Sequence, residues 1–111
     1  MSIALQTSQI DQLSETFGLL ADGTRLSIVT ACMDREIAAG DIAAELGLSA
    51  SLVSHHLRLL RATRMLRADR RGKQVFYTLA DACVRDVLTI MINHLFVHDH
   101  GCADDEEEEN D

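Results

Sequence analysis

Two short helical patterns joined at a glycine constrain the fold of this chain more than any other feature. The first covers residues 41–46 and ends at Gly47, and the second covers residues 50–62. Each repeats apolar residues at a spacing of three or four. The second pattern carries polar and basic side chains off its apolar stripe, at Ser51, Ser54, His55 and Arg58. Because these side chains hydrogen-bond phosphates and base edges, the pair predicts a helix-turn-helix whose second helix enters a DNA groove.

A basic hairpin is predicted directly after this motif. Residues 65–68 and 74–79 have the composition of strands, and the turn between them contains Gly72, which permits a positive φ. Three cations, Arg70, Arg71 and Lys73, flank that glycine. A hairpin in this position is a wing, and we expect its tip to contact the DNA backbone, adding affinity more than sequence choice.

The charge distribution supports a polyanion-binding face. The chain carries a net charge of −8, but seven of its 18 acidic residues lie in the last eight positions, 104–111. Residues 48–80, by contrast, hold seven basic residues and one acidic residue. A basic segment within an acidic chain is typical of nucleic-acid binding, and the alternative is an ordinary solvated face.

The remaining sequence predicts one mostly helical domain. We expect a flexible start over residues 1–8, a domain over residues 9–98 and an acidic, disordered tail over residues 99–111. Further helices are predicted from Ile10 to Leu20 and from about Thr24 to Met33, giving about five helices and a two-stranded wing. No apolar run is long enough to span a bilayer and no leader pattern opens the chain, so a cytoplasmic protein is expected.

The last predicted helix, residues 81–97, is apolar around most of its circumference. A helix of this kind must be buried, and a domain of this size has little interior in which to bury it. We therefore expect a partner subunit to cover part of it, in a homodimer formed through the terminal helices.

The chain resembles the ArsR/SmtB family of bacterial winged-helix repressors over roughly residues 10–97. The resemblance rests on residues 19–26 (LLADGTRL), 41–43 (DIA), 46–49 (LGLS) and 51–57 (SLVSHHL), and on the wing through residues 71–73 (RGK) and 76–77 (FY). It implies a dimeric repressor that leaves double-stranded operator DNA when an inducer binds. The resemblance implies that Ser51, Ser54 and His55 face the groove. Together with the polar helix face and the basic wing, it gives the full set of expected DNA contacts: Ser49, Ser51, Ser54, His55, Arg58, Arg70, Arg71 and Lys73.

A metal ion is the inducer that this resemblance favours. The family's site on its last helix has the pattern Asp-x-His, ten residues, then His-x-x-His or Glu. Here the corresponding residues are Asp81, Cys83 and His94, with Val97 in the fourth position. Cysteine is a softer ligand than histidine but a good one. Eleven residues separate Cys83 from His94, about 16 Å along a helix, so only two antiparallel helices of a dimer can join them at one ion.

The fourth ligand is left open because valine cannot bind a metal. His98 lies one turn after His94 and fills the position best, and His100 or Cys102 can do so if the helix end unwinds. Such a set suits Zn, Cd, Co or Ni. The family's other thiolate site, Cys-x-Cys, falls on residues 38–40 (AAG) and is absent, which argues against arsenite.

Two other functions remain open. One is a repressor that senses redox state or persulfide through Cys32, Cys83 or Cys102, although Cys32 is more simply a buried apolar residue. The other is a dimeric interaction module that senses nothing. An enzyme is not expected, because the chain has no phosphate-binding glycine loop and no nucleophile motif.

Overall fold

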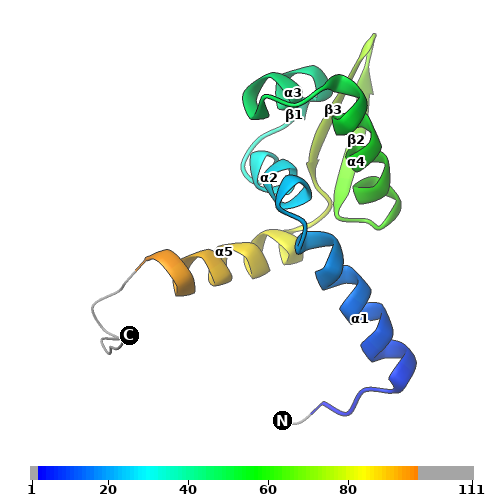
Figure 1. Ribbon diagram of the computed structural model, residues 1–111, viewed down its shortest axis with the longest axis vertical. Coiled ribbons are helices and arrows are strands. Elements are labelled where there is room, and N and C mark those ends of the chain that lie inside the picture. The colour runs from blue at the N-terminus through cyan, green and yellow to red at the C-terminus, as the bar shows by residue number, and fades with distance from the viewer. Residues whose placement is uncertain (1–2, 98–111) are drawn as a thin grey trace. The chain divides into compact units, whose positions relative to one another are not determined.

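The computed structural model describes residues 3–97 and contains two compact units, residues 1–80 and residues 81–111. Each unit is described by itself. The first contains four helices and a small sheet, and the second contains one helix (Figure 1). The prediction of a mostly helical winged helix-turn-helix fold with five helices is confirmed.

The first two helices begin at side-chain caps. Helix α1 spans Thr7–Leu20 and opens with a capping box between Gln6 and Gln9. It therefore starts three residues before the predicted Ile10. Helix α2 spans Gly23–Ala31, where the Asp22 carboxylate accepts the Arg25 backbone N–H at 2.9 Å.

The helix-turn-helix consists of α3, Ala39–Leu46, and α4, Ala50–Ala62. Gly47 ends α3 with φ +66°, a left-handed conformation that costs glycine nothing, and Ser49 then caps α4. The bounds of α4 are those predicted. Helix α3 begins two residues before the predicted Asp41, because its first turn follows directly from a short strand.

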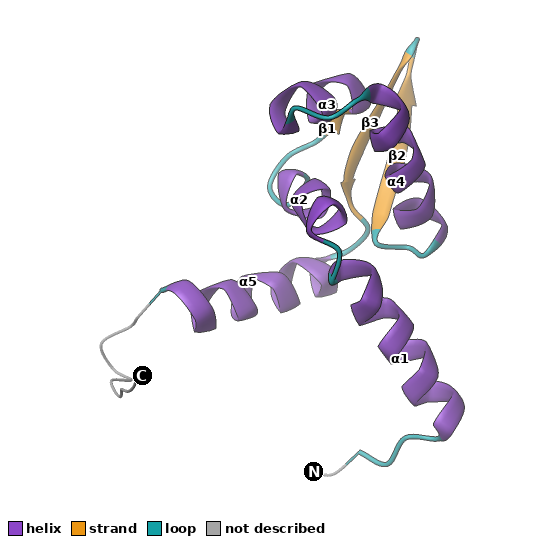
Figure 2. Ribbon diagram, viewed as in Figure 1, coloured by secondary structure: helices purple, strands orange, loops and turns teal. Residues whose placement is uncertain are grey.

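That strand, β1, covers Ile37–Ala38 and was not predicted. Strands β2, Leu66–Arg71, and β3, Gln74–Leu79, complete an antiparallel sheet of order β1-β3-β2 (Figure 2). The sheet thus has three strands, of which β2 and β3 form the wing, and the tip of the wing extends beyond the ends of α3 and α4.

The predicted turn at residues 69–73 was too long. Asp69, Arg70 and Arg71 are paired with β3 residues and belong to β2, so the turn narrows to Gly72 and Lys73. Gly72 has φ +65°, as the turn requires.

The core of the first unit forms where α2, α3 and α4 pack with the sheet. Its fully buried side chains include Ile28, Ile42, Leu57 and Leu60. Cys32, at the end of α2, is also fully buried, which confirms its interpretation as a core residue.

Helix α5 spans Ala82–Phe96, close to the predicted 81–97. Five of its large apolar side chains are at least half exposed, and so is Val97 just after the helix; the five are Val87, Ile90, Met91, Leu95 and Phe96. Within the described part of the chain, no helix combines the length and apolar character needed to cross a membrane.

Candidate nucleic-acid interface and sensor helix

Helix α4 presents a polar face to solvent. Its buried positions, Val53, His56, Leu57 and Leu60, repeat at helical spacing and attach the helix to the core. The predicted groove-facing residues Ser51, Ser54, His55 and Arg58 all lie on the exposed side. None of the four makes a side-chain hydrogen bond or ion pair within residues 3–97, so their polar groups are available to a ligand.

Ser49 has a structural task at the start of this helix. Its hydroxyl oxygen accepts the Leu52 backbone N–H at 3.1 Å and caps α4. The hydroxyl proton remains available for donation to a phosphate. A DNA contact by Ser49 is therefore compatible with its role as the cap.

His56 is a polar residue that the sequence analysis did not single out. Its side chain is 8% exposed, and its Nδ1 has no hydrogen-bond partner in the described structure. The pKa of the Asp22 carboxyl lies below its ordinary value, mainly because of the Arg25 backbone N–H and the Arg25 charge, and His56 adds to this. Its spacing from Val53 and Leu60 was the available sequence signal, since it falls on the apolar stripe.

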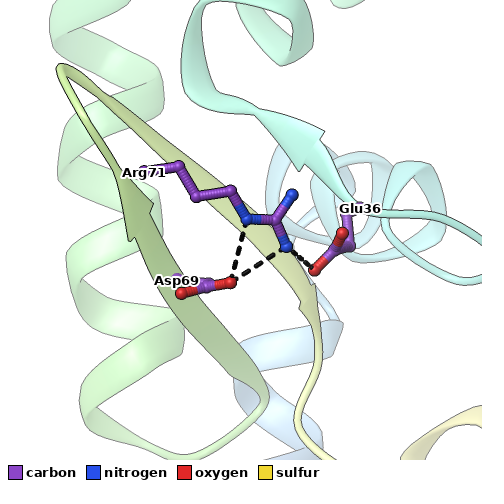
Figure 3. Close-up of polar contacts among 3 residues, drawn as sticks. All are labelled: Glu36, Asp69 and Arg71. Carbon is purple, nitrogen blue, oxygen red and sulfur yellow. Dashed lines mark hydrogen bonds and ion pairs between the residues drawn. The ribbon is translucent and has the colours of Figure 1, made fainter.

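The three cations of the wing differ in whether they form ion pairs with the protein. Arg70 and Lys73 are exposed and form no ion pair within residues 3–97. Arg71 instead turns back along the sheet, where its Nη2 lies 2.5 Å from Glu36 Oε2 and 2.9 Å from Asp69 Oδ2 (Figure 3). The two carboxylates raise the pKa of its guanidinium further above its ordinary value.

The candidate metal ligands lie at the two ends of α5. Asp81 is the N-cap, and its Oδ1 accepts the Val84 backbone N–H at 3.1 Å. Its Oδ2 makes no hydrogen bond within the described chain. Cys83 is an exposed free thiol in the first turn, and His94 is exposed in the last turn.

One chain does not bring these ligands together. Within residues 3–97, no three His, Cys, Asp or Glu side chains are grouped so that they could hold a metal ion. That agrees with the argument that one helix cannot join its own two ends. His98, His100 and Cys102 lie outside the described residues, as does the acidic tail. The donors at Asp81, Cys83 and His94 have the oxygen, sulfur and nitrogen chemistry that suits transition metals.

The two described thiols differ in chemical character. Burial raises the pKa of the Cys32 thiol from 9.0 to about 11, so it stays protonated at neutral pH. Because the thiolate is the nucleophile and the metal ligand, Cys32 is poorly suited to either role. Cys83 has no such burial and is the described thiol that reagents and ions reach.

Helix α1 exposes apolar side chains as α5 does. Ile10, Leu13 and Phe17 follow one another at helical spacing and are each about half exposed, and no residue of α1 is buried. Exposed apolar faces of this extent mark surfaces that a partner covers.

The chain is similar in sequence to known bacterial regulators. The sequence profile of the bacterial regulatory protein arsR family matches residues 22–68, which span α2 to the start of the wing. The transcriptional repressor SmtB homolog of Synechocystis is 37% identical over 91 residues, which are 82% of this chain and 69% of that protein. The regulator KmtR of Mycobacterium tuberculosis is 34% identical over 96 residues, covering 86% and 72%.

Solved structures with the same fold are also similar. Apo-NmtR matches 96% of this chain and 90% of its own with 31% identity and a TM-score of 0.74. The homodimeric winged helix-turn-helix DNA-binding domain Mb0332 from Mycobacterium bovis matches 90% and 98%, with 26% identity and a TM-score of 0.71. Reduced HlyU from Vibrio cholerae matches 82% and 95%, with 25% identity and a TM-score of 0.73.

Proposed function

Since the chain belongs to the ArsR family of bacterial transcriptional regulators, which are DNA-binding proteins and not enzymes, we propose that it is a homodimeric repressor released from its operator by a transition-metal ion. The observation that carries the DNA-binding part is the exposed face of α4 beside a wing with two unpaired cations. The metal-sensing part rests on the donors at the ends of α5.

The DNA contacts that we propose divide by task. Ser51, Ser54, His55 and Arg58 project from α4 and would read base edges in the major groove. Ser49 at the helix start, with Arg70 and Lys73 on the wing, would bind phosphates and set the position of the protein on the duplex.

A change at Ser54 tests the reading of the bases. Ser54→Ala removes a hydroxyl from the exposed face of α4, so discrimination between the operator and single-base variants should fall by about 1–3 kcal/mol at one position. Competition binding with a set of variant operators measures this. Ser14→Ala on α1 is the matched control, and equal selectivity in the two variants would remove Ser54 from the set of base contacts.

The dimer that we propose buries the exposed apolar faces of α1 and α5. Six apolar side chains along α5 and its end, and three along α1, are each about half exposed or more, which is a large apolar surface for a monomer in water. Mb0332, which shares the fold, is homodimeric. A twofold dimer also places two copies of α4 on successive turns of the major groove.

In this dimer, antiparallel α5 helices would bring Asp81 and Cys83 of one subunit near His94 of the other. A bound Zn, Cd, Co or Ni ion supplies a coordination link between the two helices. Asp81 offers its free Oδ2, Cys83 its thiolate and His94 an imidazole nitrogen. We propose His98 as the fourth ligand in place of Val97, with His100 and Cys102 as the less favoured choices.

The proposed switch is a thermodynamic linkage between the binding of the metal ion and the binding of operator DNA. The metal-free dimer holds both α4 helices at the spacing that the operator requires. Ligation by Asp81, Cys83 and His94 favours an arrangement that fits the operator less well, so the ion and DNA each lower the affinity for the other. A coupling of about 1.4 kcal/mol already changes operator affinity tenfold.

A thiol-based input is the second candidate, favoured by the exposure of Cys83 and by the similarity to HlyU, whose structure is known in a reduced form. In this mechanism oxidation or persulfidation of Cys83, with Cys102 as the second thiol, would release DNA. The buried Cys32 would take little part because its thiol stays protonated.

Fluorescence anisotropy on the DNA upstream of its own gene tests these functions together. Binding is measured with chelator and reductant, then with each ion, and then with peroxide or polysulfide in chelator. Release by one ion, reversed by chelator, supports the metal-responsive repressor. Release only by the oxidant or polysulfide supports the thiol input. Binding without operator preference would leave the dimeric interaction module.

A further inference from the structure

One arginine of the wing spans the whole sheet. Arg71 belongs to β2, and its guanidinium carbon lies 4.8 Å from the ring centroid of Phe76 on the central strand. Beyond that ring its Nη2 meets Glu36 Oε2 at 2.5 Å, next to the first residue of β1. Figure 3 shows the side chain directed from the wing towards Glu36, with Asp69 beside it.

The register of the sheet explains why the Arg71 side chain can contact Glu36 beside β1. Phe76 pairs with Asp69 of β2 on one side and with Ala38 of β1 on the other. Side chains alternate along a strand, so Asp69 and Arg71 share the face of Phe76. Glu36, two residues before Ala38, falls on this same face. The sheet therefore aligns one cation, one aromatic ring and two carboxylates in a row across three strands.

Arg70 points the other way. By the same alternation it lies on the face that carries the buried Leu66 and Leu79, opposite to Arg71. It has no ion-pair partner within residues 3–97, and neither does Lys73 in the turn. Two adjacent arginines of one strand thus have opposite environments, one engaged by protein carboxylates and one unpaired.

Three hydrogen bonds join the guanidinium of Arg71 to the carboxylates of Asp69 and Glu36. Its Nε donates to Asp69 Oδ2 at 3.1 Å, and its Nη2 donates to both Asp69 and Glu36. A phosphate could bind through Nε or Nη2 only by displacing a carboxylate, whereas Nη1 makes no hydrogen bond within residues 3–97. The donors at Nε and Nη2 are therefore committed to the protein's own carboxylates.

We propose that Arg71 is a positioning residue, which ties the wing to the flank of β1 through Glu36, while Asp69 of its own strand orients the guanidinium, and so sets the position from which Arg70 and Lys73 meet phosphate. This inference rests on the proposed DNA-binding function. It replaces the direct contact that the basic turn predicts for Arg71, and it makes the acidic Glu36 a residue that promotes DNA binding.

Glu36→Gln distinguishes the two roles by the sign of its effect. If Arg71 positions the wing, loss of the Glu36 charge frees the hairpin and operator affinity falls roughly three- to tenfold, since exposed ion pairs are individually weak. If Arg71 contacts phosphate, the same change releases it from a competitor and binding tightens. Unchanged or tighter binding would overturn the proposal.

Glu45→Gln is the matched control. Glu45 forms a 2.5 Å ion pair with Arg35 and has nearly the exposure of Glu36, 45% against 46%. The substitution removes the same charge from a similar pair that does not involve the wing. We expect its operator affinity to equal or exceed that of the natural sequence.

The salt dependence separates positioning from contact. Each lost phosphate contact lowers the slope of log K against log salt by about 0.9. Arg70→Ala should show this loss, whereas Arg71→Ala should weaken binding with the slope unchanged. A reduced slope for Arg71→Ala would place this residue on the phosphate.

An exchange of charges provides a rescue. Arg71→Glu alone should weaken binding, and adding Glu36→Arg should restore a large part of the affinity, because the ion pair reforms with reversed polarity. A phosphate contact cannot be rescued in this way, because residue 71 would remain acidic. No recovery in the double variant would contradict the positioning role.

A measurement without DNA keeps this inference separate from the proposed function. In free protein, amide hydrogen exchange across residues 70–75 should be faster by severalfold in Glu36→Gln than in Glu45→Gln. If the natural sequence fails to bind any operator, the proposed function fails, while this comparison still decides whether Arg71 holds the wing. Equal exchange in the two variants would show that it does not.

Discussion

The unit that carries the candidate DNA-binding face, residues 1–80, and the helix that carries the candidate metal ligands, α5, differ in how much of their apolar surface is buried within one chain. In residues 1–80 the apolar stripes of α2, α3 and α4 close on one another and on the sheet, leaving Ile28, Ile42 and Leu60 without exposed surface. Helix α5 is at least as rich in apolar residues as these three helices, yet Ile90 and Phe96 remain 67% and 72% exposed. The core formed by α2, α3, α4 and the sheet is complete in one chain, whereas α5, like α1 of the first unit, leaves an apolar face uncovered.

This difference assigns separate tasks to the two regions. A core that is complete in one chain would hold the proposed DNA-contacting side chains of α4 in place whatever binds elsewhere. In the proposed repressor, a helix whose apolar face and candidate metal ligands both require a second subunit would respond to assembly and to ligands.

Leu60→Ala should have the largest effect on stability. This side chain is fully buried under α4, so its truncation leaves a cavity and should lower the free energy of unfolding by about 2–5 kcal/mol. Thermal and urea unfolding measure the loss. Ile90→Ala on α5 is the comparison, and its effect should depend on protein concentration. A loss of less than about 1 kcal/mol for Leu60→Ala would mean that the first unit is less complete than its burial indicates.

Leu95→Asp should have the largest effect on assembly. A carboxylate in the apolar face of α5 would be buried without a partner in the dimer, so the dimer should dissociate. Operator affinity should then fall by at least about 100-fold, because two linked reading helices bind far more tightly than one. Analytical ultracentrifugation and anisotropy measure the two effects. Thr89→Glu, at an exposed polar position of the same helix, is the control, and dimers that survive Leu95→Asp would exclude this face from the interface.

The buried thiol of Cys32 predicts a stability change at alkaline pH. Its pKa is about 11 in the folded protein against 9.0 for an ordinary thiol, so the folded state retains the proton while the unfolded state loses it. Unfolding is therefore favoured as the pH rises above 9, and about 2–3 kcal/mol of stability should be lost by pH 11. Cys32→Ala should flatten this part of the pH profile. A profile that is the same in both proteins would mean that Cys32 does not keep its proton in the fold.

Cys83→Ser tests the sensor helix alone. Operator affinity without metal should be unchanged, because Cys83 lies outside the DNA-reading unit. The ratio of affinities without and with metal, about 5–150 for a coupling of 1–3 kcal/mol, should approach one, because a hydroxyl is a poor ligand for these ions. Cys32→Ala should keep the metal response. An unchanged response in Cys83→Ser would exclude the proposed inter-subunit site.

Elements whose bounds are set by residues close together in the sequence were predicted with nearly the observed bounds. Helix α4 has the predicted bounds because its apolar spacing, the glycine before it and the serine cap act within a few residues of one another. Strand β1 was missed because two residues carry no periodic pattern, and Ile37 and Ala38 form a strand only by pairing with Tyr77 and Phe76. The turn of the wing was predicted to be too long for the same reason. Residues 69–71 belong to β2 because they pair with β3, and no local pattern indicates that pairing.

The candidate site shows the same division. Ser51, Ser54, His55 and Arg58 were placed on one face by helical geometry alone, and the structure exposes all four. The pairing of Arg71 with Glu36 joins residues 35 positions apart, and no local pattern indicates it. His56 has a polar side chain, but it is buried because it falls on the apolar stripe of α4.

Caps, glycines and apolar spacing act over a few residues, so the helices, the order of the motif and wing, and the candidate side chains for DNA and metal binding could be predicted from the chain alone. Tertiary structure alone decided which of those side chains are already engaged. Arg70 and Arg71 are neighbours of identical chemistry, and only the pairing of β2 with β3, and of β3 with β1, leaves one unpaired and directs the other to Glu36.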